Sequence, residues 1–328
     1  MKVNLVAYRF KTLHAKWGLM YENVIDALNE LNFDVRISPY LNFITPPKNV
    51  KVGIIDSKED IYFYNHTYPE AIDGTFFRGK KSFFLKPTGP TQNHYSIDPL
   101  GFSSRVTISY ERPDFENIQY KKYWEEEVTK IKKNKLCKWE KYEHEFFENK
   151  VSIPDNHILI IGQMPSDVSI KEFSFNNHLN DLERIINKLD NKDPIVIKLH
   201  PFLKKRSNGE YWRRIKEKIF NWMVKGHTVI YGFEDLHTIL PKTKLAILEN
   251  STAGIECMMY DVPIITFGCP EYRWVCKELR QIIDLNRYKN DLSWFNRELS
   301  RKFLVWYIRD WLCYDYKSTK RRLKELLQ

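Results

Sequence analysis

The stretch IIGQMPSDVSI, residues 160–170, ends an apolar run in a glycine and then gathers short polar side chains. Gln163, Asp167 and two serines follow that glycine within seven residues. In open α/β sheets, ligands bind outside the carboxyl ends of the strands. The stretch therefore predicts a buried strand of an α/β sheet, with ligand-binding groups directly after it.

The part of the chain before this stretch alternates between strand-like and helix-like segments. We expect a strand over residues 3–8, an amphipathic helix over 21–31 and a second strand over 33–38. This βαβ opening implies a parallel sheet. Further strands are predicted over 52–56, 60–65, 82–86 and 105–110, and a charged helical region over 118–149.

The alternation restarts after a linker, SIPDNH, residues 152–157. Strands are predicted over 157–162, 194–201, 227–232, 245–250 and 262–268, and helices over 179–190, 210–224, 251–260 and the tail from 292. Such alternation is typical of a doubly wound sheet. We therefore expect an α/β protein with one domain over 1–150, helical connector included, and a second over 151–290. A ligand would then bind in the cleft between them.

The composition is that of a globular protein. Of the 328 residues, 43% are hydrophobic and 15% are aromatic, which excludes a disordered chain. The apolar runs are too short to cross a bilayer, and the N-terminal MKVNLVAYRFK lacks the features of a signal peptide. The five cysteines show no C-x-x-C spacing, so we expect reduced thiols, no zinc site and a cytoplasmic location.

The net charge of +10 raises the question of a nucleic-acid partner. The basic residues are spread along the chain, and in YKKYWEEEVTKIKKNK, residues 120–135, Glu is interleaved with Lys. This pattern is typical of a solvated helix face with ion pairs. No nucleic-acid-binding module is recognisable, so we expect no nucleic-acid partner. A basic surface equally suits phosphorylated molecules or an anionic membrane.

Three segments of the second half end a predicted strand in polar residues. The first is GQMPSDVSI, residues 162–170, in which Asp167 can accept hydrogen bonds or act as a base or nucleophile. The plain alternative is that Asp167 and Ser169 only cap a turn or helix.

The second segment is IVIKLHP, residues 195–201. Lys198 and His200 are two residues apart, so on an extended strand their side chains face the same way. An ammonium and an imidazole together suit a phosphate group. The alternative is a structural histidine beside an edge lysine.

The third segment is LENSTAGIECMMYDVPIITFG, residues 248–268. A strand ends in Asn250, Ser251 and Thr252, and a helix begins near Ala253, so hydroxyls and free N–H groups form an anion site. Glu256 follows within reach of a ribose hydroxyl. A simple helix cap explains the hydroxyls, but it does not explain why polar strand ends recur.

In this order and spacing, GQMPSDVS, KLHP and NSTAGIECMMYDVPIITFG resemble the capsule-polysaccharide glycosyltransferases, which include the bacterial β-Kdo transferases. The resemblance covers residues 157–275. It is weaker in FLKPTGPTQNHYSIDPLGFSS, residues 84–104, which is similar to the family's segment ending in Ile-Asp-Pro-x-Gly.

The resemblance implies a GT-B architecture, in which two Rossmann-like domains face each other across a cleft. It also implies a C-terminal helical tail, residues 291–328, that packs back on the N-terminal domain. The expected activity is metal-independent transfer of a sugar from a nucleotide-activated donor, a CMP-linked, Kdo-like one, to a glycan or glycolipid acceptor. The nucleotide-sugar is a substrate, and no cofactor is expected.

The resemblance also assigns roles by matching motifs. Asp167 is the expected catalytic residue, which attacks the anomeric carbon in a retaining double displacement. The expected donor-binding residues are Gln163, Ser169, Lys198, His200, Ser251, Thr252 and Glu256. Of these, Lys198 and His200 would contact the nucleotide and its phosphate, and Glu256 the ribose.

The sequence also departs from the family pattern. Leu199 stands where the family has proline, and CPEYRWVC follows PIITFG where the family often has a Gly-Trp-Gly segment. The family's N-terminal catalytic acid is missing from the interval GKKSFFLKPTGPTQNHYS, residues 79–96. The acceptor-side candidates are Glu70, His94 and Asp98, with His66 and Asp73 as further substitutes.

Two questions stay open at this point. The chain could use a UDP- or GDP-sugar on the same fold, or bind nucleotide or glycan without turnover. The tail RKFLVWYIRDWLCYDYKSTKRRLKELLQ, residues 301–328, could brace the N-terminal domain or lie on an anionic membrane as an amphipathic helix. The second alternative would place a cytoplasmic protein at the inner membrane face.

Overall fold

The chain forms two compact units. Unit 1 comprises Met1–Pro113 and Val305–Gln328, and unit 2 comprises Asp114–Leu304. These divisions lie away from 150 and 290, because the segment after Pro113 groups with the second half and the chain returns to unit 1 at Val305. The computed structural model describes residues 2–7, 18–39, 51–52, 61–65, 81–138, 151–165, 167, 169–170, 178–189, 192–203, 209–231 and 235–328.

Unit 1 contains a six-stranded sheet in the order β3-β2-β1-β4-β5-β6. Its strands are β1 (Lys2–Ala7), β2 (Asp34–Pro39), β3 (Lys51–Val52), β4 (Ile61–Asn65), β5 (Lys81–Pro87) and β6 (Tyr95–Asp98). All neighbours are parallel except β5 and β6. The predicted βαβ opening is confirmed, with α2 (Gly18–Glu30) between β1 and β2. The strand order reverses between β1 and β4.

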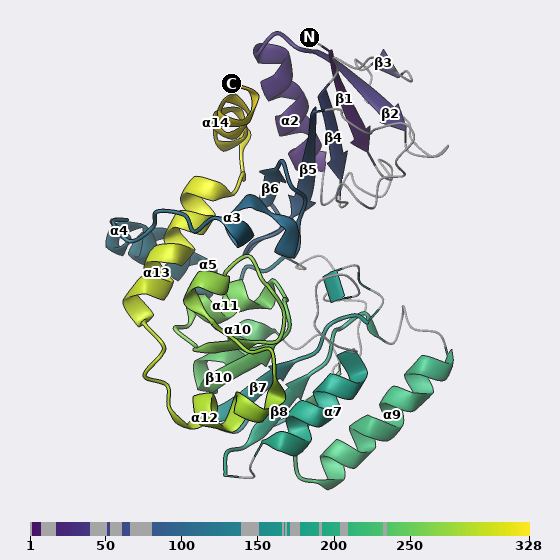
Figure 1. Ribbon diagram of the computed structural model, residues 1–328, viewed down its shortest axis with the longest axis vertical. Helices are drawn as coiled ribbons and strands as arrows, with labels where there is room; N and C mark the ends of the chain where they lie inside the picture. The colour runs from purple at the N-terminus through teal and green to yellow at the C-terminus, as the bar shows by residue number, and fades with distance from the viewer. Residues whose placement is uncertain are drawn as a thin grey trace. The chain divides into compact units, whose positions relative to one another are not determined.

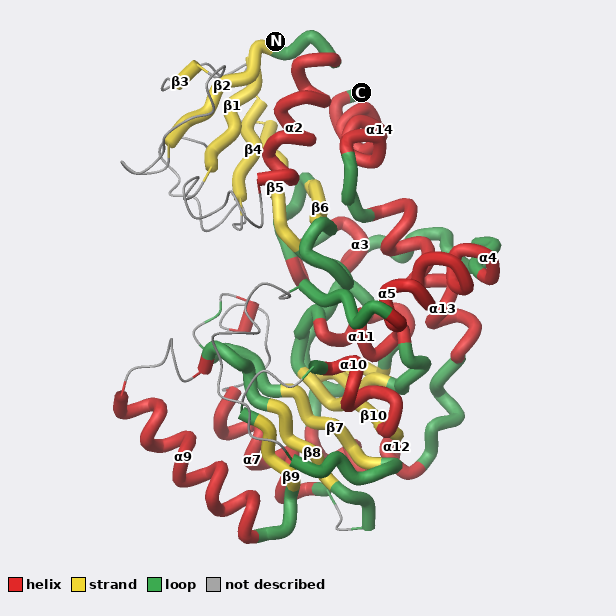
Figure 2. Tube along the Cα trace, turned by 180° about the vertical axis from the view of Figure 1, so that it is seen from behind, coloured by secondary structure: helices red, strands yellow, loops and turns green. Residues whose placement is uncertain are grey.

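The C-terminal helix α14 (Tyr316–Leu327) lies beside α2 in unit 1 (Figures 1 and 2). Leu323 is fully buried in the same apolar cluster as α2 and the strands, and Leu326 and Leu327 pack against it. Asp315 begins α14 with a capping box to Ser318. The apolar side chains of α14 are therefore part of the core of unit 1.

The strand predicted over 105–110 is wrong. These residues follow a 3₁₀ turn, Ser103–Arg105, and form the short helix α3 (Thr107–Tyr110). Both carboxylate oxygens of Asp98 accept the Thr107 N–H, at 3.1 and 3.0 Å. This cap outweighs the strand preference of the β-branched residues in the segment.

The charged helical region opens unit 2. The segments α4 (Lys121–Tyr123), a π-helical turn (Trp124–Val128) and α5 (Thr129–Lys133) follow one another without a break. Trp124, Val128 and Ile131 are buried at helical spacing. Residues 139–150, the rest of the predicted helix, lie outside the described part of the chain.

Unit 2 contains a second six-stranded sheet, in the order β12-β11-β10-β7-β8-β9. The strands are β7 (His157–Ile161), β8 (Ile195–Lys198), β9 (Thr228–Ile230), β10 (Thr243–Leu248), β11 (Ile264–Thr266) and β12 (Lys277–Glu278). Every neighbouring pair is parallel. The predicted doubly wound alternation is therefore confirmed, and the strand order reverses between β7 and β10.

Helices lie on both faces of this sheet. The helices that follow β7 in the chain are α7 (His178–Lys188), α9 (Gly209–Val224), α10 (Leu236–Ile239), α11 (Ala253–Met259), α12 (Leu285–Asn290) and α13 (Arg297–Trp306). The helices α7 and α9 lie together beside the strands (Figure 2) and share one apolar cluster with alternate strand residues such as Ile160 and Ile197. The helix α11 packs against β10 and β11.

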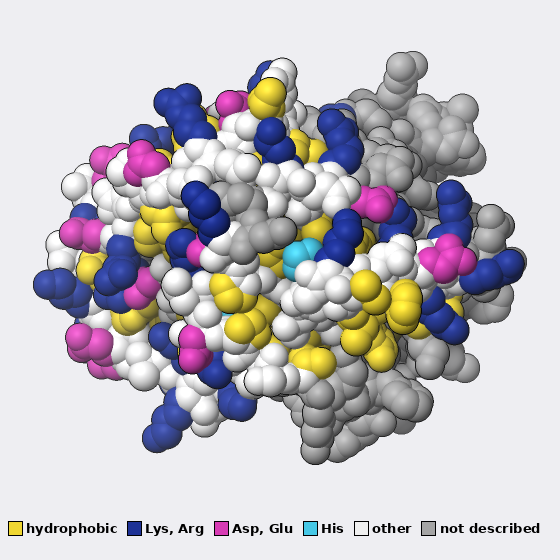
Figure 3. Space-filling view, turned by 90° about the horizontal axis from the view of Figure 1, so that it is seen from below, with side chains coloured by type: hydrophobic (Ala, Val, Ile, Leu, Met, Phe, Trp, Pro, Cys, Tyr) yellow, Lys and Arg dark blue, Asp and Glu magenta, His cyan; other side chains and the backbone are white. Residues whose placement is uncertain are grey.

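The dispersed basic residues and the short apolar runs of the sequence both have counterparts in the structure. On the face drawn in Figure 3, Lys and Arg side chains are dispersed, and Asp and Glu side chains lie among them. Within the described ranges, no helix combines the length and the apolar character that a bilayer crossing requires.

Candidate functional site

The topological switch point of unit 2 is closed by two side chains that follow neighbouring strands. Gln163 comes two residues after β7, and Asn250 comes two residues after β10. Gln163 Nε2 donates to Asn250 Oδ1 at 3.0 Å, and the Asn250 N–H donates to Gln163 Oε1 at 3.0 Å. Both side chains are buried. The pair therefore fixes the edge of the sheet at which doubly wound proteins bind ligands.

The same network orients Asp167. Asn250 Nδ2 donates to the Ser169 carbonyl oxygen at 2.7 Å. The Ser169 N–H and hydroxyl both donate to Asp167 Oδ1, at 2.9 and 2.7 Å. Asp167 and Ser169 therefore form the local turn that the structural alternative predicts. It is also tied through Asn250 to the switch point, which brings Gln163, Asp167 and Ser169 together.

His200 lies beyond the strand that precedes it. The strand β8 ends at Lys198, so the expectation that Lys198 and His200 share one face of an extended strand is wrong. His200 Nδ1 accepts the Phe202 N–H at 3.2 Å in the turn that follows. From this hydrogen bond we assign the proton of the neutral imidazole to Nε2, the nitrogen that can donate to a phosphate oxygen.

Lys198 and Glu256 form the charged centre of the site. Lys198 alternates with Ile197, which belongs to the cluster under α7 and α9, so its side chain projects from the face that α11 covers. Glu256, on α11, is 7% exposed, and its Oε2 atom has no hydrogen-bond partner among the described residues. A buried carboxylate oxygen without a partner is costly unless a ligand supplies the hydrogen bond.

Burial dominates the protonation of Glu256. It raises the pKa of the carboxyl to about 7. The nearby charge of Asp235 acts in the same direction, while the charges of Lys138 and Lys198 act to lower this pKa. Glu256 therefore titrates near neutral pH, and two lysines favour its ionised form.

Lys138 is a charged neighbour of the site that the sequence analysis missed. Burial lowers the pKa of its ammonium group, whereas the charges of Glu271, Glu256 and Asp167 act to raise it. The lysine thus interacts with both the catalytic candidate and the ribose candidate. Its segment was interpreted as part of a solvated helix, and no motif distinguishes it.

Three contacts fix the position of the segment before Lys138. The Lys132 ammonium lies 4.5 Å from the centre of the Tyr260 ring. His237 Nε2 lies 2.9 Å from the Leu136 carbonyl oxygen, and its Nδ1 lies 2.8 Å from the Tyr260 hydroxyl. Lys135 Nζ donates to Thr238 Oγ1 at 3.5 Å. The segment is therefore held on α10 and on the end of α11.

Ser251 and Thr252 differ in what their hydroxyl groups do. Ser251 Oγ accepts the Ala253 N–H at 3.2 Å, so this residue supplies the local cap. Thr252 stands at the N-cap position, but its side chain makes no capping hydrogen bond. The Thr252 hydroxyl is therefore the better candidate for contact with a ligand.

Gly254 is required because Tyr272 packs directly on it. A Cβ atom there would lie 2.2 Å from Cζ of Tyr272, whose ring is 2% exposed and whose hydroxyl donates to the Ser251 carbonyl oxygen at 2.6 Å. We expect Gly254→Ala to destabilise the protein by about 1–3 kcal/mol, measured by urea unfolding. Gly162→Ala is the matched control, since its nearest neighbour, Leu199 Cδ2, lies 3.2 Å away. Equal stability of the two variants would contradict this explanation.

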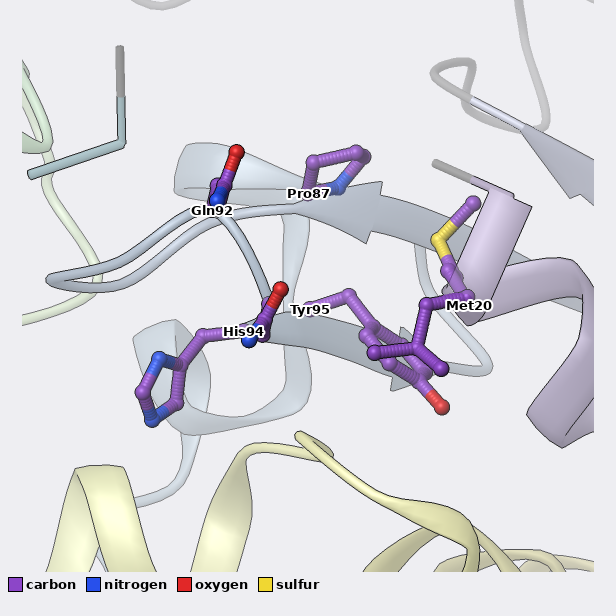
Figure 4. A pocket seen from close by; sticks show the side chains of 7 residues that line it. Met20, Pro87, Gln92, His94 and Tyr95 are labelled. Carbon is purple, nitrogen blue, oxygen red and sulfur yellow. The ribbon is translucent and has the colours of Figure 1, made fainter. Parts of the chain in front are cut away.

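His94 is the acceptor-side candidate whose surroundings are described in most detail. It lines a shallow pocket of unit 1, and its ring is directed away from Met20 and Tyr95 (Figure 4). His94 Nδ1 lies 2.7 Å from the Thr91 hydroxyl oxygen, and the ring centre lies 5.6 Å from that of Tyr314. Burial lowers the pKa of His94 to about 4, so the ring is neutral at pH 7.

The structure gives less support for the other acceptor-side candidates, Asp98 and Glu70. Asp98 is fully buried, and its carboxylate accepts the N–H groups of Leu100 and Thr107, so a structural role accounts for the contacts described. Glu70, together with His66 and Asp73, lies outside the described residues. Asn65, which no sequence motif marks, is a polar residue at the end of β4, beside the switch point of unit 1. It is 7% exposed, and neither amide atom has a hydrogen-bond partner among the described residues.

Metal-ligating side chains are not gathered in this site. In the part of the chain that the structure describes, no group of three or more His, Cys, Asp or Glu side chains is placed to hold a metal ion. The groups that the site offers to an anion are Lys198, Lys138, His200 and the Thr252 hydroxyl.

Comparisons with known proteins agree with the motifs. A family model described as "Capsule polysaccharide biosynthesis protein" matches residues 105–280. The solved structure of Thermosulfurimonas dismutans KpsC, beta Kdo 2,7 transferase, is 14% identical over 100% of both chains, with a TM-score of 0.51. That of the beta Kdo 2,4 transferase of the same protein is 14% identical over 100% of this chain and 98% of the other, with a TM-score of 0.54. No curated protein sequence matches. At this identity the two structures show the fold, and they confirm the predicted GT-B architecture of two Rossmann-like units.

Proposed function

The chain belongs to the capsule polysaccharide biosynthesis protein family, and on this premise we propose that it is a glycosyltransferase with a nucleotide-sugar donor site in unit 2. The observation that carries the proposal is the buried Glu256 carboxylate, whose Oε2 atom has no hydrogen-bond partner among the described residues and on whose pKa the charge of Lys198 acts. A carboxylate of this kind suits a ribose hydroxyl, which donates the missing hydrogen bond. A lysine next to it suits the phosphate of the same nucleotide.

The donor-side residues other than Ser251, which caps α11, then have a defined part in the site. The ribose hydroxyl donates to Glu256, and the phosphate oxygens accept from Lys198 Nζ, His200 Nε2 and the Thr252 hydroxyl. Gln163 and Asn250 hold the two strand ends at a fixed spacing. Lys138 favours the ionised form of Glu256 and is therefore a positioning residue in this proposal.

Asp167 is proposed as the nucleophile. Its carboxylate forms a bond to the anomeric carbon as the bond from that carbon to the phosphate oxygen breaks, and the nucleotide leaves with the electron pair. An acceptor hydroxyl then attacks the anomeric carbon and gives up its proton to water, while the bond to Asp167 breaks and its electron pair returns to the carboxylate, so two inversions give net retention. Lys198 and His200 stabilise the charge on the leaving phosphate by preorganised donors, without a metal ion. Ser169 holds Oδ1, which keeps the carboxylate oriented during both steps.

The proposed donor is CMP-linked and Kdo-like, and the acceptor is a glycan or glycolipid. Support comes from the resemblance of three motifs to the β-Kdo transferases. The runner-up is a UDP- or GDP-sugar on the same fold, because a fold alone does not select a nucleotide.

A nucleotide panel tests the proposal. Thermal unfolding is measured with CMP, UMP, GDP and ADP for the wild type and for His200→Ala. A ligand at 100 times its dissociation constant adds about 2.7 kcal/mol of apparent stability, so a true site gives a clear shift. We expect CMP alone to stabilise the wild type, with a smaller effect in the variant. Stabilisation by UMP or GDP instead would indicate a UDP- or GDP-sugar as the donor. An unchanged unfolding temperature with every nucleotide would favour a protein without a donor site.

The pH dependence of CMP binding provides a second test. Because the pKa of Glu256 is raised to about 7, the carboxylate that accepts the ribose hydroxyl is lost as the pH falls below 7. We expect CMP affinity to rise on the order of tenfold between pH 6 and pH 8, beyond any change seen in Glu256→Gln. Glu256→Gln removes the titrating carboxyl group, whereas the CMP phosphate titrates equally with both proteins. The difference between the two pH profiles of CMP affinity therefore reports Glu256 alone. Parallel profiles in a calorimetric titration would show that Glu256 does not contact the nucleotide.

A further inference from the structure

The outer face of α9 carries an exposed apolar stripe. Phe220, Met223 and Val224 are 66%, 51% and 71% exposed. Phe220 and Val224, four residues apart, face away from the buried residues Ile215, Ile219 and Trp222, and Met223 lies at the border of that exposed side. No described helix or strand of unit 2 lies over this side of α9 (Figures 1 and 2). Three large apolar side chains are therefore presented to the surroundings together.

The N-terminal half of the same face is cationic. Arg213 and Lys216 precede Phe220 by seven and four residues, which places them on the same side of the helix. Arg213, Arg214 and Lys216 are exposed, and none forms an ion pair within the described residues. Lys218, in contrast, is paired with Glu183 across to α7. From 213 to 225 the sequence has five basic residues and one acidic residue, Glu217.

We infer that this outer face of α9 docks the protein on a membrane surface that contains anionic lipid. Peripheral membrane helices combine Lys and Arg with large apolar side chains, and stable attachment takes both features. On α9 the cations would contact lipid phosphates while Phe220, Met223 and Val224 enter the headgroup boundary. The net charge of +10 adds attraction to the same surface.

One other surface, and one other occupant of α9, are less well supported. The apolar residues of α14 are packed in unit 1, so the C-terminal helix has no apolar face to insert. A protein partner on α9 is disfavoured because the exposed apolar surface is small. A stable interface buries about 800 Å² per partner, and three side chains supply less than that. A membrane needs only the shallow insertion that this stripe provides.

Vesicle flotation tests the inference without using the proposed activity. The protein is mixed with phosphatidylcholine vesicles and with vesicles that also contain phosphatidylglycerol, at low salt and at 0.5 M salt. We expect flotation only with phosphatidylglycerol, weakened by salt. Phe220→Ser, Met223→Ser and Val224→Ser together should reduce affinity at least tenfold. Arg213→Gln, Arg214→Gln and Lys216→Gln together should reduce it on the order of 100-fold.

Ile283→Ser is the matched control, since Ile283 is 69% exposed in a 3₁₀ turn outside α9, and it should float like the wild type. The replaced side chains are exposed, so each variant should keep the wild-type unfolding temperature. Absence of wild-type binding to phosphatidylglycerol, or equal loss in Ile283→Ser, would overturn the inference. So would a wild-type dimer that the apolar variant converts to a monomer, because the stripe would then be a self-interface.

Discussion

Asp167→Asn is expected to reduce turnover of a CMP-linked donor at least about 100-fold while CMP affinity stays within a few-fold of the wild type. The amide keeps the shape of the side chain and can still accept from Ser169, whose N–H and hydroxyl lie 2.9 and 2.7 Å from Oδ1. It has no negative charge with which to attack the anomeric carbon. The measurement is the rate of CMP release, with CMP affinity measured by calorimetry.

Asp291→Asn is the control for this prediction. Asp291 accepts the Ser293 N–H at 3.0 Å, which is the same local turn as that of Asp167 and Ser169. It belongs to unit 2 but lies outside the switch point, so this variant should keep full turnover. Full turnover in Asp167→Asn would remove Asp167 from the mechanism, even if the donor site itself were correct.

Lys198→Met is expected to weaken CMP binding by about 10- to 100-fold. The lysine is 7% exposed at the end of β8, and its charge acts on Glu256. Its removal deletes the proposed contact with the phosphate. It also raises the pKa of Glu256 further, because one of the two lysines that lower this pKa is gone. The measurement is a calorimetric titration with CMP at pH 7 and pH 8, and part of the lost affinity should return at the higher pH.

Lys289→Met separates loss of binding from loss of stability. Lys289 is another buried lysine of unit 2, paired with Asp193 at 2.9 Å. Asp193 keeps a second partner, Lys244, at 2.8 Å. We expect this variant to unfold at a lower temperature and to bind CMP as the wild type does. If both lysine variants lose CMP binding equally, the effect of Lys198 is structural.

The sequence predicted which polar residues of the candidate site follow strands and lie together. An apolar run that ends in glycine or polar residues marks a strand terminus, and parallel strands bring such termini to one edge. Gln163, Asp167 and Asn250 were recognisable for this reason. The strand predicted over 105–110 was wrong because its β-branched residues favour a strand, whereas the Asp98 carboxylate caps a helix there. That cap depends on a residue nine positions away, which local preference does not include.

Lys138 could not be identified from sequence for a related reason. It reaches Glu256 and Asp167 only because His237 and Thr238 hold the preceding residues on α10. These contacts join positions about a hundred residues apart. Burial of Glu256 is likewise a property of packing, so its raised pKa has no counterpart in the motif around it.

A crystal structure of the protein with CMP shows whether unit 2 holds the nucleotide. We expect the nucleotide at the β7–β10 switch point of unit 2, with a ribose hydroxyl hydrogen-bonded to Glu256 Oε2 and phosphate oxygens at Lys198 Nζ and His200 Nε2. Nucleotide bound in unit 1, or at the opposite edge of the unit 2 sheet where Asp193 and Lys289 pair, would contradict it.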